Sequence, residues 1–151
     1  MTADPMMARI QDAVLRQLRG EKAEARDEMA ALWEEIGGDG DPLHRCTLAH
    51  YMADLQEDPV SSLEWNERSL TAAEALSDDR LRLTFPALSV AGFMASLHLN
   101  LAEDYRQLAD VDNARRHLVR GEVATSDLPE GGYGAMVRAG LARLRAALEA
   151  R

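Results

Sequence analysis

The chain has 151 residues, of which 46% are hydrophobic and 28% charged, and its formal net charge is −9. This composition is typical of a folded domain rather than a disordered segment, and the length suits one domain with its own core. The negative charge opposes nonspecific binding to nucleic acids or anionic lipids, so we expect neither as a partner. The single cysteine, Cys46, excludes an internal disulfide framework, and the N-terminus lacks the apolar run of a secretion signal, so we expect a cytoplasmic location.

Three Asp-Pro pairs mark places where helices are expected to begin. Asp4-Pro5, Asp41-Pro42 and Asp58-Pro59 each combine an acidic N-cap with a proline, whose missing N–H costs nothing in the first turn. The apolar spacing predicts that the first helix ends at Gly20, and that another, beginning near residue 21, ends at Gly37. The first half of the chain therefore reads as two helical hairpins.

Residues 101–122 form the clearest unit, in which two helices are joined by a polar turn and Asp110 is the expected N-cap of the second. Small residues stand where the helices would cross, and large residues fill the spaces beside the crossing. The small residues are Ala102, Ala109, Ala114 and Gly121, and the large ones are Leu101, Tyr105, Leu108 and Leu118. An ordinary helical hairpin from a bundle is the alternative interpretation.

This alternation of small and bulky residues resembles one unit of a tetratricopeptide repeat, which stacks in arrays with a period of about 34 residues. Ala13 and Ala49 lie 36 residues apart, close to that period, whereas Ser62 and Ser69 replace the alanines usual in the family. The resemblance implies an all-α, right-handed solenoid of antiparallel hairpins with about seven helices. Its units would cover residues of about 5–37, 42–77 and 86–124 in a single domain, followed by a capping helix at about 133–150.

Residues 77–95 interrupt the period, because Ala49 and Ala102 are 53 residues apart. We expect this insert to pack on the array. Either Pro86 lies in the first turn of an unusually long helix that continues to Leu108, or the insert covers the groove.

The last expected helix is basic, with four arginines against one acid, Glu149, between Tyr133 and Arg151. Val137, Leu141, Leu144 and Leu148 recur on one face, which we interpret as covering the open end of the array. A basic helix lying on a membrane surface is the alternative. Arginine replaces lysine almost throughout, since Lys22 is the only lysine; with the many alanines, this is typical of a GC-rich bacterial genome such as an actinobacterium's.

In the tetratricopeptide family the first helix of each unit lines a concave groove that holds a peptide or a partner's helix. The resemblance therefore implies a non-catalytic adaptor or scaffold that binds a protein or peptide and uses no cofactor. The carboxylate clamp of the family needs a groove lysine, which is missing here. The matching groove positions are Cys46, His50 and Asp54 in the second unit and Leu99, Glu103, Arg106 and Gln107 in the third.

Three further hypotheses follow from the residues. Cys46 and His50 are four residues apart, as two zinc ligands on a helix would be, with His44 nearby; we prefer a buried cysteine and polar histidines, and expect no metal site. A regulatory sensor would bind a small ligand or peptide, with the insert as its lid. A homodimer would use apolar faces of the insert region, at Leu83, Phe85 and Phe93.

Overall fold

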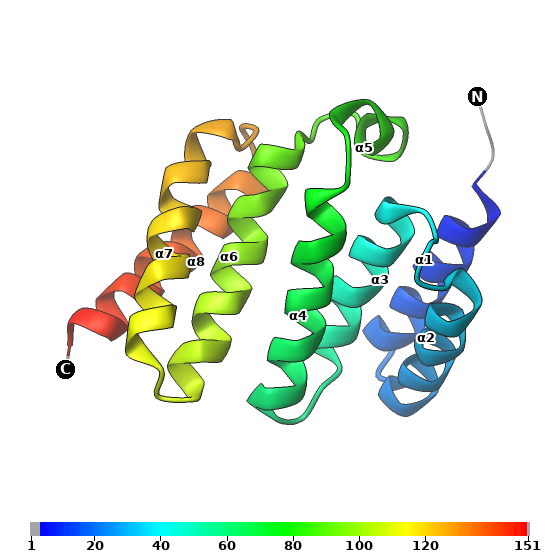
Figure 1. Ribbon diagram of the computed structural model, residues 1–151, viewed down its shortest axis with the longest axis horizontal. Helices are drawn as coiled ribbons and strands as arrows, with labels where there is room; N and C mark the ends of the chain where they lie inside the picture. The colour runs from blue at the N-terminus through cyan, green and yellow to red at the C-terminus, as the bar shows by residue number, and fades with distance from the viewer. Residues whose placement is uncertain (1–3, 151) are drawn as a thin grey trace.

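The computed structural model describes residues 4–150, and within them it contains eight α-helices, one short 3-10 helix and no strand. The helices pack side by side along the long axis of the molecule (Figure 1). Their bounds are α1 Pro5–Leu18, α2 Lys22–Ile36, α3 Pro42–Asp54, α4 Pro59–Glu74, α5 Asp78–Thr84, α6 Val90–Gln107, α7 Val111–Ala124, η1 Thr125–Asp127 and α8 Gly132–Glu149. The predicted all-α class is confirmed.

The acidic N-caps form as the sequence predicts. Asp4, Asp41 and Asp58 accept hydrogen bonds from backbone N–H groups in the first turns of α1, α3 and α4, and a proline follows each of them. Asp110 caps α7 in the same way, accepting from the N–H of Asn113 at 3.2 Å. These caps satisfy amides that the helix itself leaves without partners, which fixes where each helix begins.

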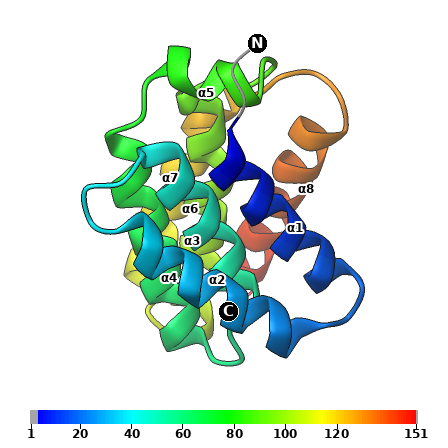
Figure 2. The ribbon, with the colours of Figure 1, turned by 90° about the vertical axis from the view of Figure 1, so that its right-hand side faces the viewer.

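Consecutive helices pair as hairpins, α1 with α2, α3 with α4, and α6 with α7, and α8 packs on the last pair. Between the pairs, α3 contacts α1 and α2, while α6 contacts α4 (Figures 1 and 2). The expected crossing residues Ala102 and Ala114 are fully buried with Leu118, so the close approach of α6 and α7 is confirmed.

The helix that the sequence analysis missed is α5, which raises the number of α-helices to eight among residues 4–150. Ser77 caps it, and two acids in its first turn favour a helix there, but seven residues are too few for a clear apolar period. Pro86 lies in a turn after α5, and α6 begins only at Val90, with Ser89 as its cap. The interpretation of Pro86 as the first turn of a longer helix is therefore wrong.

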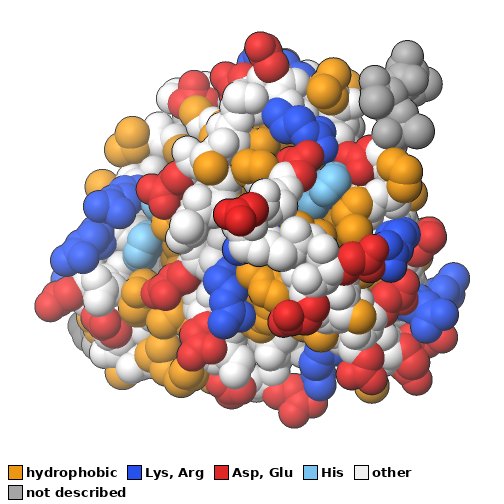
Figure 3. Space-filling model, turned by 45° about the vertical axis from the view of Figure 1, so that its right-hand side comes forward, with side chains coloured by type: hydrophobic (Ala, Val, Ile, Leu, Met, Phe, Trp, Pro, Cys, Tyr) orange, Lys and Arg blue, Asp and Glu red, His pale blue; other side chains and the backbone are white. Residues whose placement is uncertain are grey.

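The last helix begins and ends within one residue of its expected bounds. Val137, Leu141, Leu144 and Leu148 are buried in the core shared with α6 and α7, as the period predicts. In residues 4–150, no helix is both long and apolar enough to span a membrane. Acidic and basic side chains are interspersed over the face seen in Figure 3.

Candidate functional site

An apolar pocket of about 240 Å³ lies where α3, α6 and α8 meet beneath the insert. The insert contributes Leu81 from α5 and two residues of the following loop, so it roofs the pocket. We call this hollow the apolar pocket. Its lining consists of Leu43, Thr47, His50, Tyr51, Leu81, Phe85, Leu88, Phe93 and Tyr133.

Aromatic side chains form the walls of the apolar pocket. The His50 ring meets Phe93 edge to face, with centroids 5.7 Å apart, and meets Tyr51 similarly at 5.5 Å. The Tyr133 hydroxyl donates a hydrogen bond to Ser96 Oγ at 2.9 Å, which joins the start of α8 to α6. These contacts tie side chains of α3, α6 and α8 to one another around the pocket.

His50 is the polar side chain at the edge of the aromatic cluster. Burial lowers the pKa of its imidazole, and the nearby carboxylate of Asp54 only partly offsets this effect. Its Nδ1 lies 3.4 Å from Asn100 Nδ2, so the ring accepts from the amide and its Nε2 carries the proton. No other hydrogen bond of this ring is found among residues 4–150. His50 is therefore a neutral donor at physiological pH.

A second hollow of about 420 Å³ lies between α6 and α8. Glu103 accepts two hydrogen bonds from Arg106, at 2.6 and 2.9 Å, and one from Gln107 at 3.0 Å. The hydrogen bond from Arg106 is the main reason that the pKa of Glu103 is lowered. We call this hollow the polar hollow. Its lining consists of Leu99, Asn100, Glu103, Arg106, Gly140, Arg143, Leu144 and Ala147.

The apolar pocket and the polar hollow are connected through Asn100. This side chain lines the polar hollow and contacts His50, which lines the apolar pocket. The linings of the two hollows therefore touch at this contact, and together we call the two hollows the groove.

The structure brings four of the seven expected groove residues to this surface. His50 lines the apolar pocket, while Leu99, Glu103 and Arg106 line the polar hollow. Asp54 lies one turn of α3 after His50 and is exposed, outside both linings. Protein packed around its carboxyl group removes part of the surrounding water and raises its pKa. Gln107 is exposed beside Glu103, outside the lining of the polar hollow.

Cys46 does not reach the groove, which corrects the expectation from the family resemblance. Its side chain is 0% exposed and packs between α3, α4 and α6 with Ala73 and Leu97. Its Sγ lies 3.4 Å from Ser69 Oγ, and burial raises the pKa of the thiol to about 11. A thiol in this state is a core residue, neither a ligand nor a nucleophile.

The histidine near Cys46 has a different role. His44 Nε2 lies 2.9 Å from both carboxylate oxygens of Asp4, the N-cap of α1. In the part of the chain that the structure describes, no three His, Cys, Asp or Glu side chains come together as a metal site would require. His44, Cys46 and His50 therefore have three separate environments.

The sequence did not predict several residues that line the groove. Tyr51, Phe93 and Tyr133 come from three helices, and only the tertiary fold shows that they line the same pocket. Asn100 and Arg143 follow ordinary helical spacing and carry no local signal. Phe85 and Phe93, which the homodimer hypothesis placed on an outer surface, line the apolar pocket instead, while Leu83 is 77% exposed.

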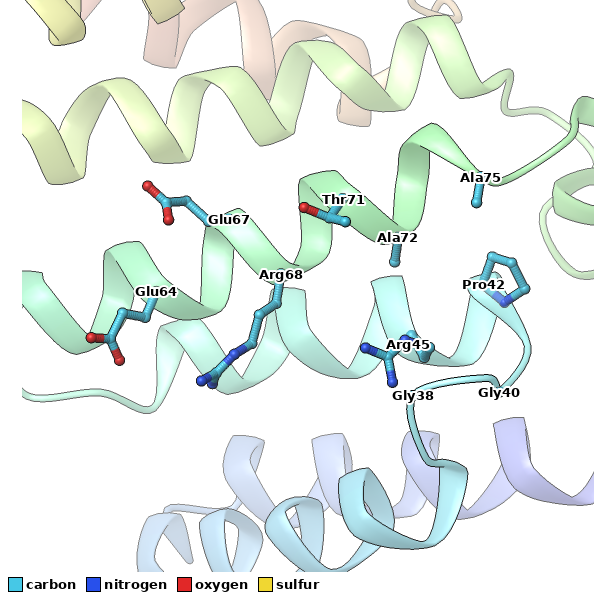
Figure 4. Close-up of a pocket in the computed structure, with 10 residues that line it drawn as sticks. All are labelled: Gly38, Gly40, Pro42, Arg45, Glu64, Glu67, Arg68, Thr71, Ala72 and Ala75. Carbon is cyan, nitrogen blue, oxygen red and sulfur yellow. The ribbon is translucent and has the colours of Figure 1, made fainter.

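A third hollow, of about 550 Å³, lies outside the groove against α4 and the turn between α2 and α3 (Figure 4). Arg45 stacks on Trp33 and Arg68 on Trp65, each with its guanidinium carbon 4.4 Å from the ring centroid. Arg45 also donates to the carbonyl of Gly37, and Glu64 lies beside Arg68 in the lining (Figure 4). Its two cations are thus engaged with aromatic rings and backbone.

Comparison of the chain with protein-family models, with curated proteins and with solved structures finds no significant match in any of the three. The candidate site therefore rests on geometry. That geometry combines an aromatic pocket with a wider hollow that carries both signs of charge. Such a surface suits a ligand that has an apolar end and a polar remainder.

Proposed function

We propose that this chain is a non-catalytic binding module that holds an extended segment of a partner protein in the groove. The observation that carries the proposal is the contact between His50 and Asn100, which places the lining of the apolar pocket directly against that of the polar hollow. A pocket for a side chain beside a hollow with hydrogen-bonding groups is what an extended peptide requires.

The order of the helices supports a tetratricopeptide-like array as the scaffold. Each hairpin contacts the next, and the groove is built from α3, α6 and α8, the first helices of successive units and the closing helix. In this arrangement the second helices buttress the first ones from behind. The proposed scaffold is therefore rigid where the partner binds, which limits the entropy lost on binding.

The polar groups of the groove favour binding over catalysis. Ser96, which is hydrogen-bonded to Tyr133 of the apolar pocket, accepts from that hydroxyl and donates to the carbonyl of Phe93 at 2.8 Å. Glu103 is neutralised by Arg106. Nucleophilic catalysis needs a hydroxyl or thiol beside a free base, and these groups are already committed to structural contacts.

Selection from a displayed library of random peptides tests the proposal. Wild-type protein should enrich peptides that bind with dissociation constants in the micromolar range, on the order of 1–100 μM, as expected for one anchored side chain on a small interface. The His50→Ala/Arg106→Ala variant should lose these peptides while keeping its helical circular dichroism, although the loss of the packed His50 ring should lower its melting temperature.

The matched control is the Glu64→Ala/Arg68→Ala variant, which alters the third hollow and leaves the groove intact. It should bind the selected peptides as the wild type does. Enrichment of no peptide, or equal binding by the groove variant, would rule out the proposal.

A sensor with the insert as its lid is the second candidate, because α5 and its loop roof the apolar pocket. In this case a small apolar ligand would occupy the pocket without a peptide. Protection of residues 77–89 from a protease by indole alone, in the absence of any peptide, would favour the sensor. Unchanged cleavage would count against it.

A further inference from the structure

We infer that the groove recognises two residues of its peptide. One is a large aromatic or aliphatic residue, whose side chain enters the apolar pocket. The other is an acidic residue four or five positions along the peptide, whose carboxylate pairs with Arg143. The inference rests on the proposed function and specifies the peptide. No sequence motif indicated it, because the pocket combines residues of α3 with residues of the insert and α8, and Arg143 lies in the expected capping helix.

The apolar pocket has the size and chemistry for one large side chain. Its volume of about 240 Å³ is below the range of about 300–1,000 Å³ typical for small-molecule sites, but it accommodates a phenylalanine, tryptophan or leucine side chain. The walls are aromatic and aliphatic, and His50 is held neutral by burial. A charged side chain would lose its hydration there without gaining an ion pair, so the pocket selects against it.

Arg143 is the cation available to a ligand in the polar hollow. Arg106, which lies in the same hollow, already forms a two-point ion pair with Glu103. Among residues 4–150, Arg143 has no ion-pair partner within 4.0 Å, and its side chain is exposed. Asp54, on the α3 side, is not part of this lining. A carboxylate from the peptide would therefore complete a pair with Arg143, and arginine forms such pairs with two parallel hydrogen bonds.

The spacing follows from the two helices that carry the groove. Phe93 and Tyr133 line the apolar pocket, and Glu103 and Arg143 line the polar hollow, each ten residues further along its helix. At a helical rise of 1.5 Å per residue, both intervals correspond to about 15 Å. An extended peptide advances about 3.3 Å per residue, so the anchor and the carboxylate must be separated by about four or five residues.

The surface between the two positions suits a peptide backbone. Gly140 lets α8 approach α6 closely, because a Cβ there would lie 2.7 Å from Leu99 Cδ2. Asn100 lies beside this contact, and its amide can both donate to and accept from a backbone. The residues between anchor and carboxylate therefore contribute mainly through their main chain, so their side chains are free to vary.

Synthetic peptides with a fluorescent label test this arrangement. A tryptophan followed by a Gly-Ser spacer and an aspartate at position four or five should bind the wild type at least about tenfold more tightly than the same peptide with lysine in place of aspartate. Peptides with the aspartate two or eight residues from the tryptophan should bind as weakly as the lysine peptide. Replacing tryptophan with alanine should abolish measurable binding.

The charge-reversed variant Arg143→Glu should invert the preference, so that the lysine peptide binds more tightly than the aspartate peptide. Arg116→Glu is the matched control, because it changes the net charge equally from an exposed site on α7 outside the groove. It should keep the wild-type preference. Equal binding of the aspartate and lysine peptides to the wild type, or the same preference in Arg143→Glu, would overturn the inference.

The library selection separates this inference from the proposed function. Peptides that need His50 and Arg106 but lack an apolar anchor spaced from an acid would refute the inference and leave the groove as the binding site. A selection that yields no groove-dependent peptide would refute both.

Discussion

Arg80 of α5 and Asp41 at the N-terminus of α3 form a two-point ion pair, with Nη2 at 2.7 Å and Nε at 2.9 Å from the same carboxylate oxygen. The Nη2 group of Arg80 also donates to Asp4 at 3.0 Å. The guanidinium of Arg80 thus ties the insert to the N-caps of two helices, α1 and α3. Burial tends to raise the pKa of Asp4, but the hydrogen bonds from His44, Met7 and Arg80 outweigh it and keep this pKa lowered.

Arg80→Ala should loosen the roof of the apolar pocket without unfolding the array. The loss of these partly buried, charge-assisted hydrogen bonds should cost about 1–2 kcal/mol, mostly in the local opening of α5. Hydrogen–deuterium exchange should therefore accelerate across residues 78–89. Arg82→Ala, an exposed arginine on the same helix, is the control and should exchange like the wild type. Equal protection in both variants would show that Arg80 does not hold the insert.

The close approach of α7 to its neighbours depends on Gly121. A Cβ at this position would lie 2.9 Å from Leu141 Cδ2 and 3.5 Å from the carbonyl of Ala95. Gly121→Ala should therefore lower the free energy of unfolding by about 1–3 kcal/mol through overpacking, even though alanine favours a helix.

Gly38→Ala is the matched control, because nothing lies within 4 Å of a Cβ at that position. Its effect should stay within about 0.5 kcal/mol. Urea denaturation of both variants measures the difference. A Gly121→Ala protein as stable as the wild type would mean that Leu141 moves aside at no cost.

Local signals predicted much of the fold. The Asp-Pro starts, the Asp110 cap and the small residues of α6 and α7 each act within a few residues of their own position, so the sequence shows them directly. The insert depends on distant partners: the contact between Arg80 and Asp4 joins residues 76 apart. The sequence offered an insert that covers the groove as one of two alternatives, but no periodicity shows which contacts hold the insert there.

The candidate site illustrates the same limit. Cys46 and His50 are four residues apart and were placed together in the groove, yet α4 and α6 bury the former, while the latter lines the apolar pocket. Helical spacing predicts which side of a helix a residue occupies, but not which neighbour covers that side. Phe93 and Tyr133 line the same pocket only because α6 and α8 pack against each other.

The paired histidines of α6 and α7 should make stability depend on pH. His98 Nδ1 lies 3.0 Å from His117 Nδ1, and burial, with the charge of a protonated His98, lowers the pKa of His117 to about 4. In the unfolded chain this pKa is near 6.5, so between these values the unfolded state binds more protons and acid favours unfolding.

Between pH 7 and pH 4, protonation of His117 should lower the free energy of unfolding by about 1–2 kcal/mol, after allowance for the partial exposure of this side chain to solvent. His117→Gln removes this titration and should flatten the curve of unfolding free energy against pH by that amount. His50 and His98 still make stability depend on pH in the same direction, because burial lowers the pKa of each. Parallel curves for the variant and the wild type would show that the His117 pKa is not depressed in the folded protein.

Asp104 is a buried carboxylate that fixes α6 against α4. It accepts hydrogen bonds from Asn66 Nδ2 at 2.6 Å and Ser62 Oγ at 2.8 Å, and its side chain is nearly inaccessible to solvent. Asp104→Ala should lower the free energy of unfolding by about 2–3 kcal/mol, because it leaves the buried amide of Asn66 with only the long 3.5 Å contact to Ser62 Oγ. Asp104→Asn keeps the size and one acceptor, so it should cost less than half as much. Chemical denaturation at pH 7 measures the free energy of unfolding of both variants. Equal destabilisation by the two substitutions would show that the charge of Asp104, rather than its hydrogen bond to the Asn66 amide, accounts for the effect.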